Sequence, residues 1–241
     1  MCTVSWVRTE AGLEVFFSRD ERRERAPEEP LQESVAPGGG RILSPRDGEA
    51  GGTWFGVNDA GLAMGLLNHV GVVAERDDLR SRGLLLLDLL GAPSPAAVRS
   101  ALAAADLARH RPFRVVVFRA RGEPRLFTWD GRTLAQSVPE APLVSSSFRP
   151  GTVGPERLEA WRAMGPPADR AGLLAFHRSH LPEAGPASVC MHRDEAATRS
   201  LVHAVLGRSA VVLRHHPAPP CRPTAWAEAS LPLAAPATPT P

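Results

Sequence analysis

The chain has 241 residues, of which 43% are hydrophobic, and its formal net charge is +2. This composition supports a sizeable core in one large domain or two small ones. All 28 basic residues are arginine, and no basic block is interleaved with aromatic residues, so nucleic acid is not expected as a partner. The run of four leucines at residues 84–87 is far shorter than the roughly 20 apolar residues that a membrane span needs.

The three cysteines, Cys2, Cys190 and Cys221, stand at unrelated spacings. An odd number at such spacings fits neither a disulfide framework nor a zinc site, so we expect no metal and no cofactor. The chain opens on a predicted strand, without the basic and apolar regions of a signal peptide. These observations predict a soluble protein of the reducing cytoplasm and leave its oligomeric state open.

The first predicted element is a β-hairpin. Residues 3–8 and 13–17 are rich in β-branched and aromatic types, and the turn signal between them ends in Gly12. With a two-residue loop, the numbers of paired residues sum to 21, which places Cys2 opposite Arg19. Directly opposed residues have Cβ atoms roughly 5 Å apart. A thiol and a guanidinium are therefore expected to meet at one end of the hairpin.

Cys2 has the chemistry of a nucleophile that carries its own base. Removal of Met1, expected before a small residue, would leave a free α-amine with a pKa of about 7.7–8.0 beside the thiol. Arg19 supplies a cation that lowers a thiol pKa. Asp20 or Glu21 could hold the ammonium form and orient it, and a register slip of two would place Cys2 opposite Glu21 instead of Arg19. Spacing alone favours the simpler interpretation, a buried small residue next to a solvated charge run.

A second hairpin follows a loop predicted over residues 26–40, which are rich in proline and glycine. Residues 53–58 and 62–68 flank an Asn-Asp-Ala-Gly turn. Asn68 ends the second strand, where its amide could donate a hydrogen bond to an oxyanion. An amide that satisfies the neighbouring backbone is an equal alternative.

The rest of the chain alternates helix pairs with strands, which predicts an α+β fold. Helices are predicted over residues 80–90, 95–108, 155–164 and 169–180. Further strands are predicted over residues 113–119, 125–129, 132–137, 187–192, 198–205 and 211–215. His177 and His180, three residues apart in the last helix, are expected at the surface rather than at a metal. From residue 217 proline recurs, which predicts a disordered tail over residues 217–241 in which Trp226 is the one possible anchor.

Three N-terminal segments resemble the NRDE family, also called the transport and Golgi organisation family. Its members begin Met-Cys, carry an Asn-Arg-Asp-Glu box after one hairpin, and then a Gly-Gly-Thr-Trp segment that ends in Asn. The corresponding segments here are Met1-Cys2-Thr3, Ser18-Arg19-Asp20-Glu21 and residues 51–58. A Thr-Arg-Ser sequence at residues 198–200 resembles a further family segment, so matching pieces span about residues 1–205.

This family resembles the N-terminal nucleophile hydrolases with a cysteine nucleophile, such as bile-salt hydrolases and penicillin V acylases. The resemblance implies a four-layer αββα sandwich over residues 1–216 and hydrolysis of a non-peptide amide or ester in a small-molecule substrate. The site residues that it implies are Cys2, Arg19, Asp20, Asn68, Ser146 and Arg199.

Three departures from the family pattern bear on the oxyanion and substrate contacts more than on the nucleophile. Ser18 replaces the first Asn of the box, Ser146 stands where relatives carry an active-site Asn, and His69-Val70 replaces the Tyr-Arg that follows Asn68 in the family. The resemblance also leaves a second function open, a non-enzymatic haem- or lipid-handling role in trafficking, as some eukaryotic relatives suggest. In that case haem is a possible bound ligand. Its candidate ligands are His69, His177, His180, His192, His203, His215 and His216.

Overall fold

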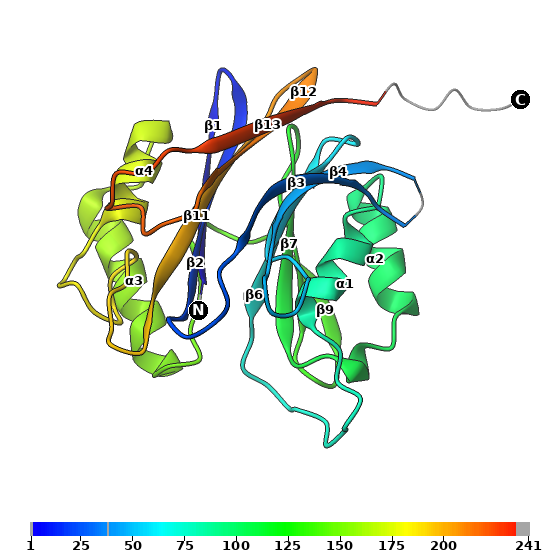
Figure 1. Cartoon of the computed structure of the whole chain (residues 1–241), viewed down its shortest axis with the longest axis horizontal. Coiled ribbons are helices and arrows are strands. Elements are labelled where there is room, and N and C mark those ends of the chain that lie inside the picture. The colour runs from blue at the N-terminus through cyan, green and yellow to red at the C-terminus, as the bar shows by residue number, and fades with distance from the viewer. Residues whose placement is uncertain (1, 38, 235–241) are drawn as a thin grey trace, which may run out of the picture.

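Two antiparallel sheets stack face to face, and each carries helices on its outer side (Figure 1). This computed structural model describes residues 2–37 and 39–234. The first sheet has the order β10 (Leu143–Ser145), β1 (Cys2–Thr9), β2 (Gly12–Arg22), β11 (Ala196–Leu206), β12 (Ala210–His216) and β13 (Ala227–Pro232). The second has the order β3 (Glu29–Val35), β4 (Arg41–Arg46), β5 (Phe55–Asn58), β6 (Leu62–Asn68), β7 (Phe113–Arg119), β8 (Arg125–Trp129) and β9 (Leu134–Ser137).

The outer layers complete the four-layer αββα sandwich that the family resemblance implies, within the α+β class that the sequence predicts. Helices α3 (Pro150–Met164) and α4 (Arg170–Arg178) cover the first sheet, and α1 (Arg82–Leu89) and α2 (Pro95–Ala104) cover the second (Figure 1). A single 3-10 turn, η1 (Leu107–Arg109), follows α2. In the described part of the chain, no helix is both long and apolar enough to cross a bilayer.

Side-chain alternation along β1 and β2 decides which layer each residue meets. Val4 lies opposite Phe17, and both are buried in the core between the two sheets. Phe16, one position along, belongs to the core between this sheet and helices α3 and α4. Because strand side chains alternate between faces, Arg19 faces the opposite sheet while Asp20 faces the helices. Neighbouring residues at the end of β2 therefore contact different layers.

Local signals set the helix boundaries. The side chain of Ser94 accepts a hydrogen bond from the Ala97 backbone at 3.2 Å, and Pro95 occupies the first turn, as the sequence predicts for the start of α2. Ser81 caps α1 in the same way through the Gly83 backbone nitrogen. These caps satisfy backbone donors that a helix start leaves unpaired.

Two of the predicted loops and strands differ from the structure. Residues 29–35 form β3, an exposed edge strand paired with β4, rather than a loop. The sequence does not predict this strand because it contains Pro30 and is mostly polar. An edge strand tolerates both features. Residues 187–192 form turns rather than a strand, and only His192 makes an isolated bridge, to Ala197.

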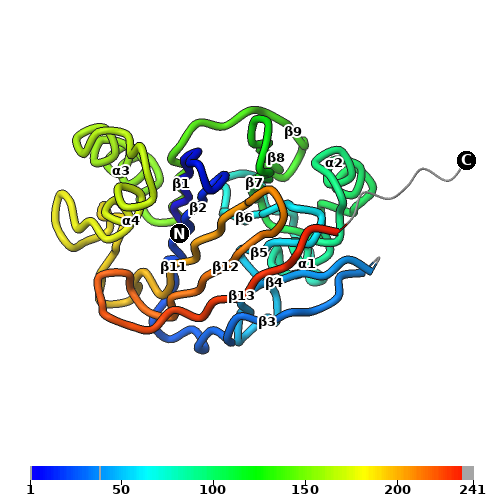
Figure 2. Tube along the Cα trace, turned by 90° about the horizontal axis from the view of Figure 1, so that it is seen from above, coloured from blue at the N-terminus to red at the C-terminus, as the bar shows by residue number. Residues whose placement is uncertain are grey.

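The domain extends past the predicted boundary at residue 216. Residues 227–232 form β13, which pairs with β12 and lies beside β3 and β4 of the other sheet (Figure 2). Leu231 is fully buried in the core between the sheets, and Trp226 lies 5.0 Å from His216 between ring centroids. The prediction of disorder from residue 217 is therefore wrong for this strand, and residues 235–241 lie outside the described part of the chain.

Candidate active site

Cys2 begins the strand β1 and lies directly opposite Arg19 of β2. Thr9 faces Gly12 at the other end of the hairpin, so the numbers of paired residues sum to 21, as predicted, without a slip. On its other side Cys2 faces Ser145 of β10, whose hydroxyl accepts a hydrogen bond from the Cys2 nitrogen at 3.1 Å. The strand pairing thus holds Cys2 from both sides.

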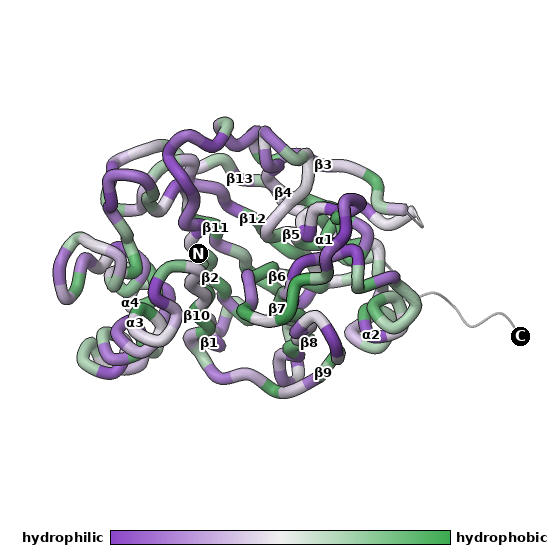
Figure 3. Tube along the Cα trace, turned by 90° about the horizontal axis from the view of Figure 1, so that it is seen from below, coloured by the Kyte–Doolittle hydropathy of each residue, from purple (hydrophilic) through white to green (hydrophobic). Residues whose placement is uncertain are grey.

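A cavity of about 160 Å³ opens at this end of the sandwich. It lies where β1 and β2 meet the segment before β5, the end of β6 and the start of α1. Figure 3 views the molecule from this end, with the amino terminus near the middle. The lining of the 160 Å³ cavity includes Cys2, Arg19, Asp20, Asn68, Trp54 and Arg82. Four of the six predicted site residues therefore share one cavity.

The surroundings of the Cys2 thiol act on its pKa in opposite directions. Burial raises the pKa, and the charge of Asp20 adds to that effect. The charge of Arg19 and a hydrogen bond from the Asp20 backbone to the sulfur lower it. Because only the thiolate is a strong nucleophile, an attack by this sulfur would need a base to remove the thiol proton.

Arg19 is fixed in place by two carboxylates and an aromatic ring. Its guanidinium donates to Glu28 at 2.8 Å and to Asp47 at 2.5 Å. The same group lies 4.4 Å above the centre of the Trp54 ring, within the range of a cation–π contact. Arg19 therefore acts as a rigid cation in the wall of the cavity.

The carboxylates around Arg19 are themselves held in the ionised form. Burial alone would raise the pKa of Asp47, but hydrogen bonds from Arg25 and the Ala50 backbone, with the charge of Arg19, lower it to about 2. Burial opposes ionisation of Glu28 as well, yet a hydrogen bond from His215 and the charge of Arg19 lower the pKa of Glu28. The wall is therefore a network of paired charges.

Asp20 points away from Arg19 into the helix layer, where it meets Arg157 of α3. The two side chains form an ion pair at 2.8 Å, and neither is exposed to solvent. The hydroxyl of Thr198 on β11 also donates to Asp20 at 2.6 Å. The Asp20 carboxylate thus anchors the end of β2, while the backbone of Asp20 faces Cys2. Sequence analysis gave no sign of Arg157, which lies 137 positions along the chain.

Asn68 and Arg82 close the cavity on the side of the second sheet. No protein hydrogen bond engages the Asn68 side-chain amide among the described residues, so the amide is available to a ligand. Burial lowers the pKa of Arg82, and its guanidinium donates to the carbonyl of Pro112 at 2.9 Å. Arg82 sits in the first turn of α1, whose amino-terminal dipole end adds positive potential.

The Gly-Gly-Thr-Trp segment shapes the floor of this cavity. Gly51 has a φ of +66°, a backbone conformation that favours glycine. A Cβ on Gly52 would lie 2.5 Å from the carbonyl carbon of Gly83, so only glycine allows the segment to approach the start of α1. The Thr53 nitrogen then bonds the Gly83 carbonyl at 3.1 Å, and Trp54 is placed under Arg19.

Comparison with known proteins identifies the family of the chain. The family model described as "Transport and Golgi organisation 2" matches residues 1–153, more than half of the chain. The chain belongs to the transport and Golgi organisation 2 family. No curated protein sequence matches it.

Solved structures extend the comparison to the fold. The N-acylethanolamine-hydrolyzing acid amidase ortholog of Caenorhabditis elegans superposes with a TM-score of 0.59 at 10% identity, over 86% of this chain and 94% of that one. A mutant of the conjugated bile acid hydrolase of Clostridium perfringens superposes with a TM-score of 0.53 at 12% identity, over 88% of each chain. At such identities the likeness establishes a shared N-terminal nucleophile hydrolase fold.

Two residues expected from the family resemblance lie away from the cavity. The Ser146 hydroxyl is turned to its own segment, where it accepts from the Phe148 nitrogen at 3.1 Å. Ser145, one position earlier, is the serine that contacts Cys2. The pairing of β10 with β1 selects between these adjacent serines, and the sequence alone does not.

Arg199 is the second expected residue that the structure places elsewhere. Thr198 pairs with Asp20 and Ser200 with Arg19, so Arg199 occupies a β-bulge and drops out of the ladder. Its guanidinium donates to the backbone carbonyls of residues 22 and 23, at 3.1 and 2.8 Å. In this family member Arg199 therefore braces the end of β2 rather than the cavity.

Ser18, which replaces the first Asn of the family box, belongs to a buried group of three hydrogen-bonded side chains. His177 of α4 contacts Ser18 through Nδ1 at 2.7 Å and Ser5 through Nε2 at 2.8 Å. All three residues are fully buried, so the prediction of a surface His177 is wrong. Burial, together with the charge of Arg157, lowers the pKa of His177 to about 3 and keeps the ring neutral.

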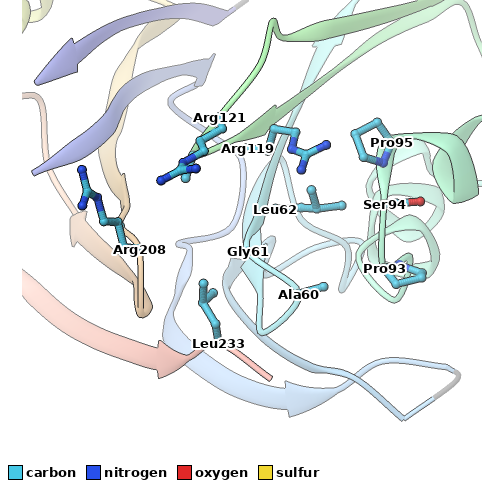
Figure 4. A pocket seen from close by; sticks show the side chains of 12 residues that line it. Ala60, Gly61, Leu62, Pro93, Ser94, Pro95, Arg119, Arg121, Arg208 and Leu233 are labelled. Atoms are coloured by element: carbon cyan, nitrogen blue, oxygen red, sulfur yellow. The ribbon is translucent and has the colours of Figure 1, made fainter. Parts of the chain in front are cut away.

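A larger cavity, of about 310 Å³, lies at the opposite end of the sandwich (Figure 4). It is formed by the turns after β5, β7 and β11, and its lining includes Arg119, Arg121, Arg208, Leu62 and Leu233. No cysteine or histidine is among these lining residues in the described chain. Of these two cavities, the smaller one has a cysteine in its lining.

Proposed function

We propose that this family member is a cysteine-dependent N-terminal nucleophile hydrolase that cleaves an amide or ester bond in a small non-peptide molecule. The observation that carries the proposal is the cavity in which the Cys2 thiol, the Arg19 cation and the Asn68 amide converge. The paired register of β1 with β2 and β10 supports a fixed position for the nucleophile. The fold supports the same class.

The proposed reaction begins after removal of Met1, which leaves Cys2 with a free α-amine. This amine takes the thiol proton, and the sulfur attacks the carbonyl carbon of the substrate to form a C–S bond. The hydroxyl of Ser145, 3.1 Å from the Cys2 nitrogen, orients the amine toward its own thiol. A base of pKa about 7.7–8.0 on the nucleophile itself suits proton transfer near neutral pH.

The tetrahedral intermediate carries its negative charge on the former carbonyl oxygen. The Asn68 amide and the Asp20 backbone N–H, which already points at the sulfur, are the proposed donors to this oxygen. Arg82 and Arg19 add positive charge in the cavity wall. Collapse of the intermediate breaks the C–N or C–O bond, and the protonated α-amine gives its proton to the leaving group.

Hydrolysis of the resulting thioester completes the cycle. The α-amine takes a proton from water, the hydroxide oxygen attacks the acyl carbon, and the C–S bond breaks. The released thiolate recovers the proton from the amine, and the product leaves as a carboxylic acid. No step needs a group other than the chain, the substrate and water.

The size of the cavity points to the kind of substrate. Its volume of about 160 Å³ is below the 300–1,000 Å³ typical of sites that enclose a drug-sized ligand. It would admit the scissile bond and one small polar group, with any longer acyl chain extending outside. The two similar hydrolases are named for N-acylethanolamines and conjugated bile acids, which are also non-peptide molecules.

A haem- or lipid-handling role is the alternative, and no specific contact favours it. Among its candidate ligands, His177 bonds two serines, His203 bonds Glu14 at 2.9 Å and His215 bonds Glu28 at 2.9 Å. Each of these rings would have to leave a buried partner to bind iron. We therefore keep hydrolysis as the proposal.

Intact mass and thiol labelling of the purified chain test the proposal directly. We expect loss of Met1 and selective labelling of Cys2 by a short pulse of iodoacetamide, ahead of buried Cys190 and exposed Cys221. A panel of N-acyl amides and esters should then be hydrolysed by the wild type and not by Cys2→Ala, which should still bind substrate. Retained Met1, or a Cys2 no more reactive than Cys221, would overturn the proposal. Equal loss of binding and hydrolysis in Cys2→Ala would make Cys2 a structural residue.

A further inference from the structure

Four side chains with metal-binding atoms meet on the helix-covered side of the first sheet, away from the cavity of Cys2. His180 follows α4, Cys190 and His192 lie in the segment before β11, and Cys221 lies in the connection between β12 and β13. Their ligand atoms all lie within 4.8 Å of one another. Three separate parts of the chain thus bring two imidazoles and two thiols to one point.

The distances within this cluster match a tetrahedral ion. The Nε2 atom of His192 lies 3.5 Å from the Cys190 sulfur and 3.4 Å from the Cys221 sulfur. Zinc–sulfur bonds of about 2.3 Å and zinc–nitrogen bonds of about 2.0–2.1 Å at tetrahedral angles place sulfur and nitrogen roughly 3.5 Å apart. The contacts are therefore those that one shared ion would produce.

The two histidines approach from different directions. The rings of His180 and His192 have centroids 5.1 Å apart and planes inclined at 68°. Stacked rings would direct their nitrogens along parallel lines, whereas inclined rings can direct them at a common point. Two nitrogens and two sulfurs form a donor set typical of structural zinc, in which all four positions are filled by protein.

We propose that His180, Cys190, His192 and Cys221 bind one zinc ion as a structural site. This proposal departs from the expectation of no metal site, which rested on the spacing of the cysteines without the histidines. The ligands are 10, 2 and 29 positions apart in the chain, which matches no short zinc motif. Only the fold brings them together.

The contacts of the ligands show what the ion stabilises. The Cys190 nitrogen donates to the Ser179 carbonyl at 3.0 Å, and the next residue, Met191, donates from its nitrogen to the Thr198 hydroxyl at 2.8 Å. Thr198 in turn holds Asp20 at the end of β2. Zinc would thus join two segments of the chain. One is the connection between β12 and β13, which carries Cys221, and the other is the segment before β11, which contacts Thr198.

Metal analysis of the full untagged chain tests the proposal. We expect about one zinc per chain after purification without added metal, and a cobalt-substituted sample with the d–d absorption of tetrahedral cobalt bound to thiolate. Chelation should lower the midpoint of thermal unfolding. These readouts do not depend on hydrolytic activity.

Variants localise the metal. Cys221→Ser changes an exposed ligand and should lose most of the zinc while remaining folded, and His180→Asn is a second variant at the cluster. His69→Asn alters a half-buried histidine outside the cluster and should keep the metal. A wild type without stoichiometric zinc and without a cobalt spectrum would overturn the proposal. So would a purified chain in which mass spectrometry finds Cys190 and Cys221 joined as a disulfide, or equal zinc in the wild type and Cys221→Ser.

Discussion

Asp20 and Arg157 form an ion pair at 2.8 Å in which neither side chain is exposed to solvent. Arg157 also donates to the Thr3 hydroxyl at 2.7 Å, so one guanidinium binds both β1 and β2 from the helix layer. A charge without a partner is far less stable in a protein interior than in water. The pair therefore couples the packing of α3 to the strand ends that carry Cys2.

Substitution Arg157→Met should lower the free energy of unfolding by about 3–5 kcal/mol, because it takes the guanidinium away from the buried Asp20 carboxylate. Urea denaturation followed by circular dichroism measures the change. Arg162→Met removes an exposed pair with Glu159 in the same helix and should change stability by less than about 1 kcal/mol. Similar losses in the two variants would contradict the role of the buried pair.

Substitution Arg19→Gln should shift the labelling of Cys2 to higher pH. Burial raises the pKa of the Cys2 thiol, and Arg19 is one of the groups that lower it, so removal of the charge raises it further. The rate of iodoacetamide labelling at Cys2, measured from pH 6 to pH 10, reports this shift. Arg19→Lys keeps the charge and should shift the profile less. An unchanged profile in Arg19→Gln would show that the cation does not act on the thiol.

The buried His177 should make stability fall at mildly acidic pH. Its pKa is about 3 in the folded chain, below the ordinary value of 6.5, so the unfolded chain binds the proton first. The stability that neutral His177 supports is complete above pH 6.5 and is lost as pH falls toward 3. Linkage gives a loss of about 1.4 kcal/mol at pH 5.5 for this residue.

Comparison with His177→Gln isolates that contribution. Glutamine can donate to one serine and accept from the other without titrating. The fall in unfolding free energy between pH 7.5 and pH 5.5 should therefore be about 1.4 kcal/mol smaller in the variant than in the wild type. Chemical denaturation at the two pH values measures it, and equal falls would show that His177 is not buried as a neutral ring.

The strand β13 should contribute to stability despite its proline- and alanine-rich surroundings. Leu231 is fully buried between the sheets, and Leu231→Ala should cost about 2–5 kcal/mol. Leu181, which is 49% exposed, provides the control, since Leu181→Ala should have little effect. Urea denaturation of both variants compares them, and a negligible effect at Leu231 would place β13 outside the cooperative domain.

The part of the site that is local in sequence could be predicted. A hairpin turn of known length fixes which residues face each other, and this was enough to pair Cys2 with Arg19. The second hairpin likewise delivered Asn68 to the same end. The family segments added Gly52, whose close approach to Gly83 leaves no room for a side chain.

The part that depends on distant segments could not be predicted. Arg157 lies in a helix with weak amphipathic character, and nothing near it signals a carboxylate partner 137 positions earlier. The β-bulge at Arg199 turns that side chain away from the cavity, and a one-residue difference in strand pairing exchanges Ser146 for Ser145. Each of these depends on a register that local composition does not encode.

The two cavities lie at opposite ends of the sandwich, so at least about the length of β1, from Cys2 to Thr9, separates them. Seven steps of about 3.3 Å make that separation roughly 23 Å. Anions attracted to Arg119, Arg121 and Arg208 would therefore bind beyond the reach of a substrate bonded to Cys2. If such anions inhibited hydrolysis, their effect would have to reach Cys2 through a movement of the strands. An inhibitor that competes with substrate for the thiol would have to bind in the cavity at Cys2.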